Sequence, residues 1–539
     1  MDAPPVNPRR SPASRSRLPS GRLPRVSPIW LTIPAIIAII GTAVSASDAI
    51  AHDTGYTTVT IWWLASLGFL LLAALPPSPL HWISGAWTRP TPRTWAPWIG
   101  MIAIAAIPRL VLLDRFPTVL DGDESAFIIR AVAFRRGDLS DWFGISFYGN
   151  PNSWAAAQGL VTEIAGTGPA GHRSLSALVG IIGVLATWRL GRHLLGEPAA
   201  SIGAILLAAW PLHLHLSRVA LNNITDPAAL SLSLLFLVRT VTFRRPIDAV
   251  ACGFSLALGL HGYYGGRAFP FVILALLPIL AFRHRLGIRN TAFFLSWIVI
   301  AFVSAAAPLL ATFQGNPSEF GGHMEMVSPF TLANLREQPV ETIRLYLPNL
   351  WEAITYPATG GHVGYFRHGP PYFGWPLCVL IGIGAITLLV RLARSRDISA
   401  LACLAIPWAL LTAGIATTVP ISGQRFLALT PIFALVAGLG LRGLASQIAH
   451  LDSSRLRLAP NAISILALAV LTTAHLAWMA SEDRQIETYG DMRTIAAWDL
   501  GWRLSRDLVD PSPTIYFAGA PFIWSQSFPA SPSSPAICP

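Results

Sequence analysis

The chain has 539 residues, of which 53% are hydrophobic and only 12% are charged. This balance is typical of a polytopic membrane protein and excludes an ordinary soluble domain. The formal net charge is +11 and every basic residue is an arginine; these arginines lie in short loops between apolar runs, which indicates membrane topology rather than nucleic-acid binding.

The chain opens with a polar segment and has no cysteine framework. Residues 1–27 are rich in Pro, Ser and Arg and have no apolar period, which predicts a disordered cytoplasmic tail. A signal peptide needs a small-residue cleavage site after its apolar run, and none is clear here. Three of the four cysteines lie inside apolar runs and Cys538 is penultimate, so no spacing indicates disulfides or a metal site.

Apolar runs of membrane-spanning length dominate the rest. A spanning helix needs about 20 mostly apolar residues. The sequence predicts an all-α polytopic membrane protein with about 13 transmembrane helices, of which the fifth, seventh and eighth are short. The segments are 29–47, 57–76, 96–114, 174–194, 199–215, 224–242, 247–262, 267–282, 292–312, 372–392, 399–419, 426–446 and 460–480.

The arginines alternate in number from loop to loop. The N-terminal tail carries six, and every second short loop after it carries two or three. The opposite loop 48–56 has none, and the other short turns on that side have one each: Arg218, Arg267 and Arg425. This positive-inside bias predicts thirteen spans, with the N-terminus inside, the C-terminus outside and two long external loops, 115–173 and 313–371.

Three carboxylates crowd the stretch Leu120-Asp121-Gly122-Asp123-Glu124, just after a run long enough to span a bilayer. Carboxylates are costly in lipid, so a cluster at the mouth of a membrane helix indicates a functional site. The alternative is a solvated loop whose acids cap a helix starting at Ser125. Residues 124–137 form an amphipathic helical pattern that would lie along the membrane surface.

Several fragments then match a known family in order and spacing. The chain resembles the GT-C superfamily of membrane glycosyltransferases, in particular glycosyltransferase family 39, with the protein O-mannosyltransferases and the lipid A aminoarabinose transferases. The resemblance covers roughly residues 100–450. The fragments are Arg109–Pro117 followed by Asp123-Glu124, Arg173–Gly180 continuing to Trp188–Arg192, His215–Ala220, Tyr263-Tyr264 with Arg267, and Gly423–Phe426 with Pro431.

The resemblance implies a function. Such enzymes take a hexosyl or pentosyl group from a polyprenyl-phosphate carrier and transfer it, usually with inversion, to a lipid, glycan or protein acceptor outside a membrane. For this chain it implies a multi-pass protein of a bacterial cytoplasmic membrane, whose partners are a lipid-linked donor, an acceptor and the membrane, with no nucleic acid. The GT-C type catalytic domain would be residues 96–480, with external juxtamembrane helices, and residues 28–95 would be two additional helices.

The first acid of the family's Asp-Glu pair is its proposed general base, which corresponds to Asp123. A carboxylate near the lipid boundary can have a raised pKa suited to taking a proton from an acceptor hydroxyl. Glu124 would be a helper that orients the acceptor or a metal. Asp121 is outside the family pair and is interpreted as loop.

The leaving phosphate needs cations placed in advance. Arg267 and Arg425 are the main predicted phosphate ligands, and Arg218 is an equal choice between phosphate binding and snorkelling to headgroups. Arg109 is a minor candidate. Tyr263 and Tyr264 are predicted either at the substrate or as aromatics of the membrane interface.

Two departures from the family stand out. Many bacterial relatives carry an acid shortly after the Ser-Arg of the second external turn, where this chain has Asn222-Asn223 and, further on, Asp226. A second catalytic acid is therefore not predicted, no cofactor is certain, and a divalent metal stays open. The histidines, among them His213 and His215, lack ligand spacing.

The second departure is the external C-terminal segment, residues 481–539, which offers one amphipathic helix over 489–508 and one strand over 514–518. One strand cannot form a stable sheet, so this segment is predicted to be short relative to the family. The alternative function is a secondary transporter, which the missing internal repeat and the external acids disfavour.

Overall fold

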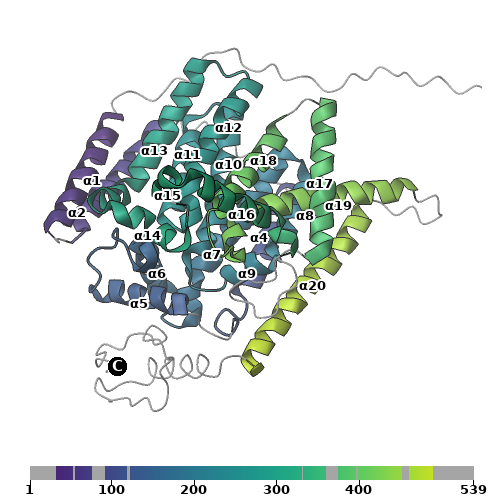
Figure 1. Ribbon diagram of the computed structural model, residues 1–539, viewed down its shortest axis with the longest axis horizontal. Helices are drawn as coiled ribbons and strands as arrows, with labels where there is room; N and C mark the ends of the chain where they lie inside the picture. Colours follow the sequence, from purple (N-terminus) through teal and green to yellow (C-terminus); the bar gives the residue numbers. More distant parts are fainter. Residues whose placement is uncertain are drawn as a thin grey trace, which may run out of the picture.

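The protein is almost entirely helical (Figure 1). The computed structural model describes residues 32–52, 55–75, 92–117, 122–330, 332–359, 374–395, 398–451 and 460–489. Within these ranges there is no β-strand, and the one isolated β-bridge joins Ile145 to Pro151. The predicted all-α class is confirmed. The predicted tail 1–27 and strand 514–518 lie outside the described residues, as does the predicted helix 489–508 after its first residue.

Every predicted apolar segment overlaps a helix. By length and composition, ten helical segments of the described chain qualify as membrane spans. Three further apolar segments are shorter: Trp95–Leu110 within α4, Glu197–Ala208 (α8) and Pro246–His261 (α11). Thirteen spans therefore stay a prediction. The apolar helices are α1 (Thr32–His52), α2 (Thr57–Ala74), α4 (Pro92–Leu110), α7 (Pro169–Leu194), α8 (Glu197–Ala208), α10 (Thr225–Phe243), α11 (Pro246–His261), α12 (Phe269–Arg283), α13 (Ile288–Gly315), α17 (Gly374–Ser395), α18 (Ile398–Ile415), α19 (Thr430–Leu451) and α20 (Pro460–Tyr489).

One predicted segment is wrong in extent. The run 199–215 was expected to be a single helix, but α8 ends at Ala208 and a separate short helix, α9 (Pro211–Leu216), follows. Pro211 has no N–H and its ring clashes with the preceding turn, so it starts a helix and cannot continue one. The break turns residues 211–216 back toward α7 and α4.

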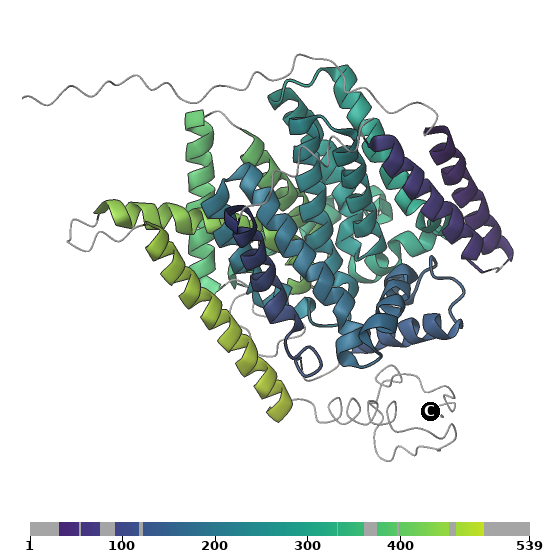
Figure 2. The same cartoon turned by 180° about the vertical axis from the view of Figure 1, so that it is seen from behind.

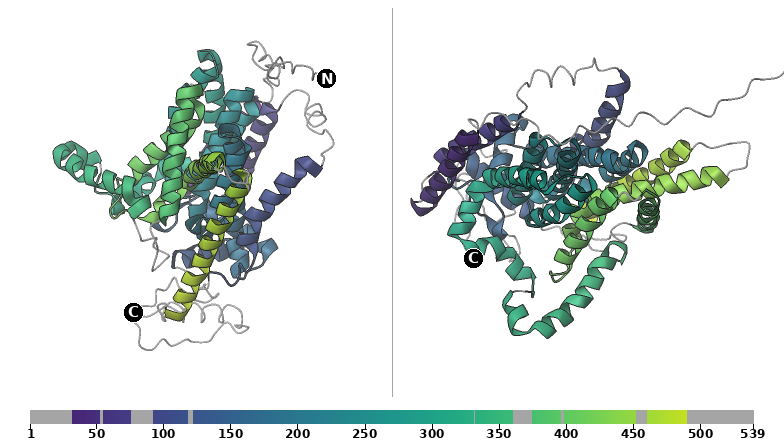
Figure 3. Two further views of the ribbon diagram at one scale, coloured as in Figure 1. Left: turned by 90° about the vertical axis from the view of Figure 1, so that its right-hand side faces the viewer. Right: turned by 90° about the horizontal axis from the view of Figure 1, so that it is seen from above.

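The remaining helices belong to the two long loops and to turns. In loop 115–173 they are α5 (Gly122–Arg136), η2 (Phe147–Gly149) and α6 (Asn152–Ala165). In loop 313–371 they are α14 (Pro317–Val327), α15 (Leu332–Glu337) and α16 (Pro339–Thr359), which form an arc beside the bundle (Figure 3). The turns contain η3 (Asn222–Ile224), η4 (Tyr264–Ala268) and η5 (Gly423–Leu429).

Helix α5 confirms the helix predicted over 124–137, but its apolar face contacts protein rather than lipid. Phe127 and Ala131 are buried, and α5 packs against α6 across Gly159, where a Cβ would lie 2.9 Å from the carbonyl oxygen of Ala131. The hydrophobic contact holds α5 and α6 together as one layer at one end of the bundle (Figure 2). The first turn of α5 is thereby fixed against the bundle.

The first two helices pack as a hairpin at one edge of the bundle. The indole Nε1 of Trp63 donates a hydrogen bond to the carbonyl of Ala305 at 2.9 Å, and the Ser66 and Ser304 hydroxyls lie 2.9 Å apart. The hairpin also reaches loop 115–173, because Trp142 Nε1 donates to Thr60 Oγ1 at 3.0 Å. These polar contacts attach α1 and α2 to α13 and to the loop that carries the acids.

Candidate functional site

The two acids of the Asp-Glu pair begin helix α5 and point into different surroundings. Asp123 and Glu124 lie in the first turn of α5, where the helix dipole favours negative charge. Asp123 is exposed, whereas Glu124 is completely buried. Residues 118–121, which include Asp121, lie outside the described chain. The pair therefore provides one carboxylate at the surface and one inside the protein.

Glu124 is held by partners on both oxygens. Its Oε1 accepts hydrogen bonds from Arg173 Nε and from the backbone N–H of Ala220, both at 2.8 Å. Its Oε2 accepts from Arg173 Nη2 at 3.3 Å. Arg173 is also fully buried and donates to the carbonyl of Pro117 at 2.9 Å. This ion pair joins α5, α7 and the turn after α9, so Glu124 positions the start of α5.

Asp123 lies at the surface with protein packed around its carboxyl group. That packing removes water and raises the pKa of the carboxyl above its ordinary value. Asp123 is also close enough to Tyr263, on the turn after α11, for its charge to raise the pKa of the phenol. A carboxylate with a raised pKa is a better proton acceptor than a fully solvated one.

Three charged residues lie close enough to Tyr263 for their charges to act on its phenol: Asp123, Asp226 and Arg425. The pKa of its phenol is raised to about 12, mainly by burial; the charge of Arg425 acts to lower this pKa, and the charges of Asp226 and Asp123 act to raise it. The four residues come from α5, α10, the turn before η4 and η5, which are far apart in sequence. The structure thus brings together Asp123, Tyr263 and Arg425, all predicted from the sequence, and adds Asp226.

Asp226 is the residue that the sequence interpretation set aside. It is buried at the start of α10, its Oδ2 faces the backbone amides of Gly265 and Gly266, and its Oδ1 has no hydrogen-bond partner. A Cβ at position 265 would lie 2.2 Å from Oδ2, so glycine permits this approach. The sequence contained a signal that could have identified Asp226, because an acid inside an otherwise apolar helix indicates a functional site.

The Asn222-Asn223 departure has a structural reason. The amide Nδ2 of Asn222 donates to Asn150 Oδ1 at 2.9 Å and to the carbonyl of Gly262 at 3.0 Å. A carboxylate has no N–H and could make neither bond. Asn222 therefore joins the loop after η2 to the end of α11, beneath Tyr263.

Arg267 joins three segments around the candidate site. Its guanidinium donates to the carbonyls of Phe320, on α14, and Gly149, on η2, the latter at 3.0 Å. It also stacks 3.9 Å from the centroid of the Tyr264 ring. Gly149 has a φ of +69°, and a Cβ there would lie 2.2 Å from the Tyr264 hydroxyl oxygen. Arg267 therefore has a structural role, and its bonds to these two carbonyls use two of its five N–H donors.

Arg425 makes fewer described side-chain hydrogen bonds to the protein than Arg267 does. The one side-chain hydrogen bond that the structure describes for it runs from Nη1 to the carbonyl of Pro420 at 2.9 Å. The neighbouring Phe426 stacks on Tyr356 of α16, with ring centroids 5.3 Å apart and planes 5° apart. Helix α16 thereby supports the turn that presents Arg425 next to Tyr263.

The other two predicted arginines are buried among backbone carbonyls. Arg218 donates to the carbonyls of Phe116, Pro108 and Leu112, the last at 2.9 Å, and so closes the C-terminal end of α4. Arg109 donates to the carbonyl of Ala105 at 2.9 Å, and its Nη2 lies 2.9 Å from His213 Nδ1. Both guanidinium groups stabilise the turns around α4 and α9.

Within the described residues, no three His, Cys, Asp or Glu side chains gather as a metal site would require. His213 is buried against Arg109, and burial lowers the pKa of His215 to about 3, helped by the charges of Arg173 and Arg218. Both imidazoles are therefore neutral, as expected of structural groups.

A family model described as dolichyl-phosphate-mannose-protein mannosyltransferase matches residues 151–310 of the chain. The match contains Arg173, Arg218, Asp226, Tyr263 and Arg267, and it starts after Asp123 and ends before Arg425. No curated protein sequence matches the chain.

The solved structure of ArnT shares the fold. ArnT from Cupriavidus metallidurans, bound to undecaprenyl phosphate, superposes with a TM-score of 0.53 at 16% identity, covering 81% of this chain and 84% of that one. The apo oligosaccharyltransferase of Archaeoglobus fulgidus has a TM-score of 0.47 at 16% identity, covering 79% of this chain. The chain spans 61% of the length of that archaeal protein.

Proposed function

We propose that the chain is a membrane glycosyltransferase of the GT-C type, which transfers a sugar from a polyprenyl-phosphate carrier to a hydroxyl acceptor. The family model that matches residues 151–310 and the fold shared with ArnT support this proposal. The observation that carries the proposal is the convergence of Asp123, Asp226 and Arg425 on Tyr263. Two acids and a cation near one residue at the end of the bundle suit a displacement reaction. In this reaction the acceptor hydroxyl loses its proton and the sugar loses its phosphate.

Asp123 is the general base. The acceptor oxygen forms a bond to the anomeric carbon while the bond from that carbon to the phosphate oxygen breaks. The acceptor proton passes to the Asp123 carboxylate, whose raised pKa suits this transfer. The polyprenyl phosphate leaves with the bonding electrons. Because attack and departure occur in one displacement, the configuration at the anomeric carbon inverts.

Arg425 stabilises the charge that grows on the leaving phosphate. It lies beside Tyr263, and the structure assigns one of its five N–H groups to a protein carbonyl, so further donors remain for phosphate oxygens. A cation fixed before the reaction stabilises the transition state more than the ground state, because the phosphate charge increases during transfer. Arg267 contributes through its charge and by holding Tyr264.

Glu124 and Asp226 are positioning residues in this proposal. Glu124, paired with Arg173, fixes the first turn of α5 and so the direction of the adjacent Asp123. Asp226 holds the amides of Gly265 and Gly266 and hence the turn that carries Tyr263 and Arg267.

We also propose that the reaction takes place on the outer face of a bacterial cytoplasmic membrane, with the N-terminus inside. The arginine bias supports this orientation, because the arginine-poor turns are those that carry Tyr263, Arg267 and Arg425. A hexose or pentose donor and a lipid, glycan or protein acceptor fit the proposal.

The test is sugar transfer by the purified full chain in proteoliposomes. Polyprenyl-phosphate-linked hexoses and pentoses are supplied with a membrane fraction as the source of acceptor, and release of polyprenyl phosphate is measured. We expect release that depends on the acceptor and is lost in Asp123→Asn. Solute uptake without any release from the donors would instead identify a secondary transporter and refute the proposal.

A further inference from the structure

Two arginines of α7 stack on two tryptophans at the arginine-rich end of the bundle, away from α5. The guanidinium carbon of Arg189 lies 5.1 Å from the ring centroid of Trp98, on α4. The guanidinium carbon of Arg192 lies 5.0 Å from the ring centroid of Trp188. The two indoles pack edge to face, with centroids 5.0 Å apart. Stacking orients a guanidinium and leaves the N–H donors at its edge available to bind oxygen atoms.

Arg189 lies among other basic groups. The charges of Arg192 and of Arg239, on α10, act on Arg189, and the charge of Glu197 opposes them more weakly. The charges of the same three arginines act on the imidazole of His193. Four basic side chains from two helices therefore lie close together, and we call them the α7–α10 cluster: Arg189, Arg192, His193 and Arg239.

The acids beside the α7–α10 cluster are already paired. Glu197 forms an ion pair with Arg192, and Asp248 forms one with Arg239 at 2.7 Å. Within the described part of the chain, no hydrogen bond or ion pair holds Arg189, which is half-buried. A partly buried cation beside like charges is unfavourable unless an anion joins it. The charge of the cluster therefore favours an anion next to Arg189.

The side of the cluster formed by α4 presents apolar surface. Trp95 is 50% exposed and Ile99 is 62% exposed, and both lie within three positions of Trp98 on this helix. Tryptophan and arginine at the ends of membrane spans are typical of the depth of the lipid headgroups. A phosphate that is attached to a lipid can therefore reach Arg189 along α4.

We propose that the α7–α10 cluster binds the phosphate of an anionic phospholipid, with Arg189 as its main ligand. A planar guanidinium can donate to two phosphate oxygens at once. The arginine bias predicts that this end faces the cytoplasmic leaflet, where anionic lipids attract basic residues. The proposed sugar-transfer site lies around Tyr263 and Arg425, at the other end of the bundle, so the inference goes beyond the proposed function and does not depend on it.

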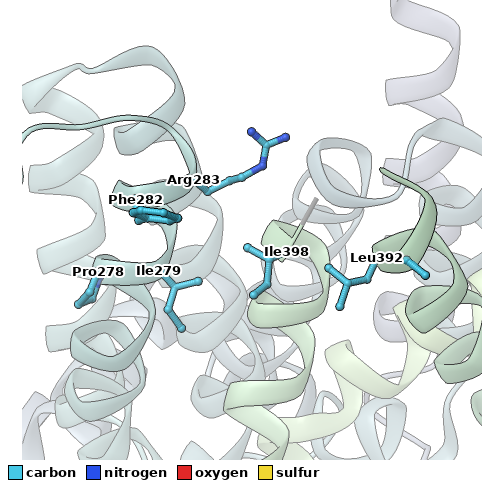
Figure 4. A pocket seen from close by; sticks show the side chains of 7 residues that line it. Pro278, Ile279, Phe282, Arg283, Leu392 and Ile398 are labelled. Carbon is cyan, nitrogen blue, oxygen red and sulfur yellow. The ribbon is translucent and has the colours of Figure 1, made fainter. Parts of the chain in front are cut away.

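A groove at the same end provides a control. It opens between α12, α17 and α18 with a volume of about 780 Å³ (Figure 4). None of the residues that line it belongs to the α7–α10 cluster. Ile398 is one of the lining residues, so Ile398→Trp should fill the groove and leave phospholipid binding at the cluster unchanged.

The test is lipid binding to the purified full chain in detergent, measured by native mass spectrometry. Phosphatidylglycerol and phosphatidylcholine with identical acyl chains are titrated separately, and we expect phosphatidylglycerol to bind more tightly. Arg189→Gln should weaken phosphatidylglycerol binding about fivefold and leave phosphatidylcholine binding unchanged, since one basic residue near an anionic surface contributes about that much. Arg189→Lys should be intermediate, because it keeps the charge and loses the planar fork.

Thermal unfolding separates this role from a purely structural one. Arg189 makes no described hydrogen bond and lies beside like charges, so Arg189→Gln should not lower the unfolding midpoint in the absence of lipid. Phosphatidylglycerol should raise the midpoint of the wild type more than that of the variant, because a ligand stabilises the folded state that binds it. A lower midpoint without lipid, with equal gains on adding it, would make Arg189 structural and refute the proposal.

Arg289→Gln is the matched control, because Arg289 is exposed at the start of α13 and its charge is not among those that act on Arg189. If Arg289→Gln and Arg189→Gln weaken binding equally, the attraction is general and the proposal is wrong. Weaker binding in Ile398→Trp but not in Arg189→Gln would place the lipid in the groove instead. Inorganic phosphate is added as a competitor, and displacement of phosphatidylglycerol by an equal concentration of it would identify a free anion as the ligand.

Discussion

Replacing Asp123 with asparagine removes one proton acceptor from the candidate site and keeps the shape of the side chain. Asp123 is exposed and Glu124, not Asp123, makes the buried ion pair that anchors α5, so the variant should fold. A positioned general base contributes about 10²–10⁴ in rate, or about 3–5 kcal/mol of barrier. The raised pKa of Asp123 indicates a basicity suited to this role. Turnover should therefore fall by about 10²–10⁴, with donor affinity nearly unchanged.

The assay is acceptor-dependent release of polyprenyl phosphate, with donor binding measured separately on the same protein. Asp138→Asn is the control, because Asp138 lies just after α5 and is exposed, so this change removes the same charge nearby. It should retain full turnover. Near-normal turnover in folded, membrane-inserted Asp123→Asn would remove Asp123 from the mechanism, and equal losses in both variants would reduce its role to general electrostatics.

The remaining predictions concern pH, phosphate binding, the anchor of α5 and topology. Activity should fall as pH decreases through the pKa of Asp123, because the base works deprotonated; this limb should lie above the ordinary aspartate value of about 3.9, and a pH–rate profile tests it. Arg425→Gln should lower turnover by about 10² and Lys should rescue it only partly, since Lys lacks the planar fork; unchanged turnover in both would remove Arg425 from the reaction. Glu124→Gln leaves Arg173 buried without its countercharge, so it should cost about 3–5 kcal/mol of stability, seen as a lower thermal unfolding midpoint, whereas an unchanged midpoint would contradict the anchoring role. Single cysteines at Ser140 and Arg394, both exposed sites, should label oppositely with an impermeant reagent in intact cells, Ser140 reacting and Arg394 not; labelling of Arg394 alone would invert the orientation.

The sequence was sufficient for the apolar helices because their length follows directly from the thickness of a bilayer. It failed where a local break overrides composition, as at Pro211, which divides the predicted segment 199–215 into α8 and α9. It also missed α6 and α14–α16, which are shorter or more polar. Helices of this kind owe their stability to tertiary packing more than to propensity, so a single sequence carries a weak signal for them.

The candidate site was partly predictable for a similar reason. Asp123, Arg267 and Arg425 were found because each departs from what its surroundings favour: charge near lipid, or arginine in an outer turn. Tyr263 was named because its turn resembles a fragment of the family. The pairing of Glu124 with Arg173 was not predictable, since the partners are 49 positions apart and nothing local links them. Asp226 was noticed but not assigned to the site, because only the fold places it beside Gly265 and Tyr263.

The arginines of the outer turns show why sidedness alone cannot assign a phosphate ligand. The positive-inside bias disfavours arginine there, so each one that persists needs a stabilising reason. A guanidinium has five N–H donors. The number of donors that already bind protein carbonyls distinguishes a structural arginine from one that can bind a phosphate. Arg218 is buried and makes four hydrogen bonds to backbone carbonyls at and after the end of α4. The last carbonyls of a helix have no N–H partner within the helix, so the guanidinium of Arg218 takes the place of that partner. Arg425 makes one such described bond and lies half-exposed close to Tyr263, so the described carbonyls use fewer of its donors, and it is the stronger candidate for a phosphate ligand.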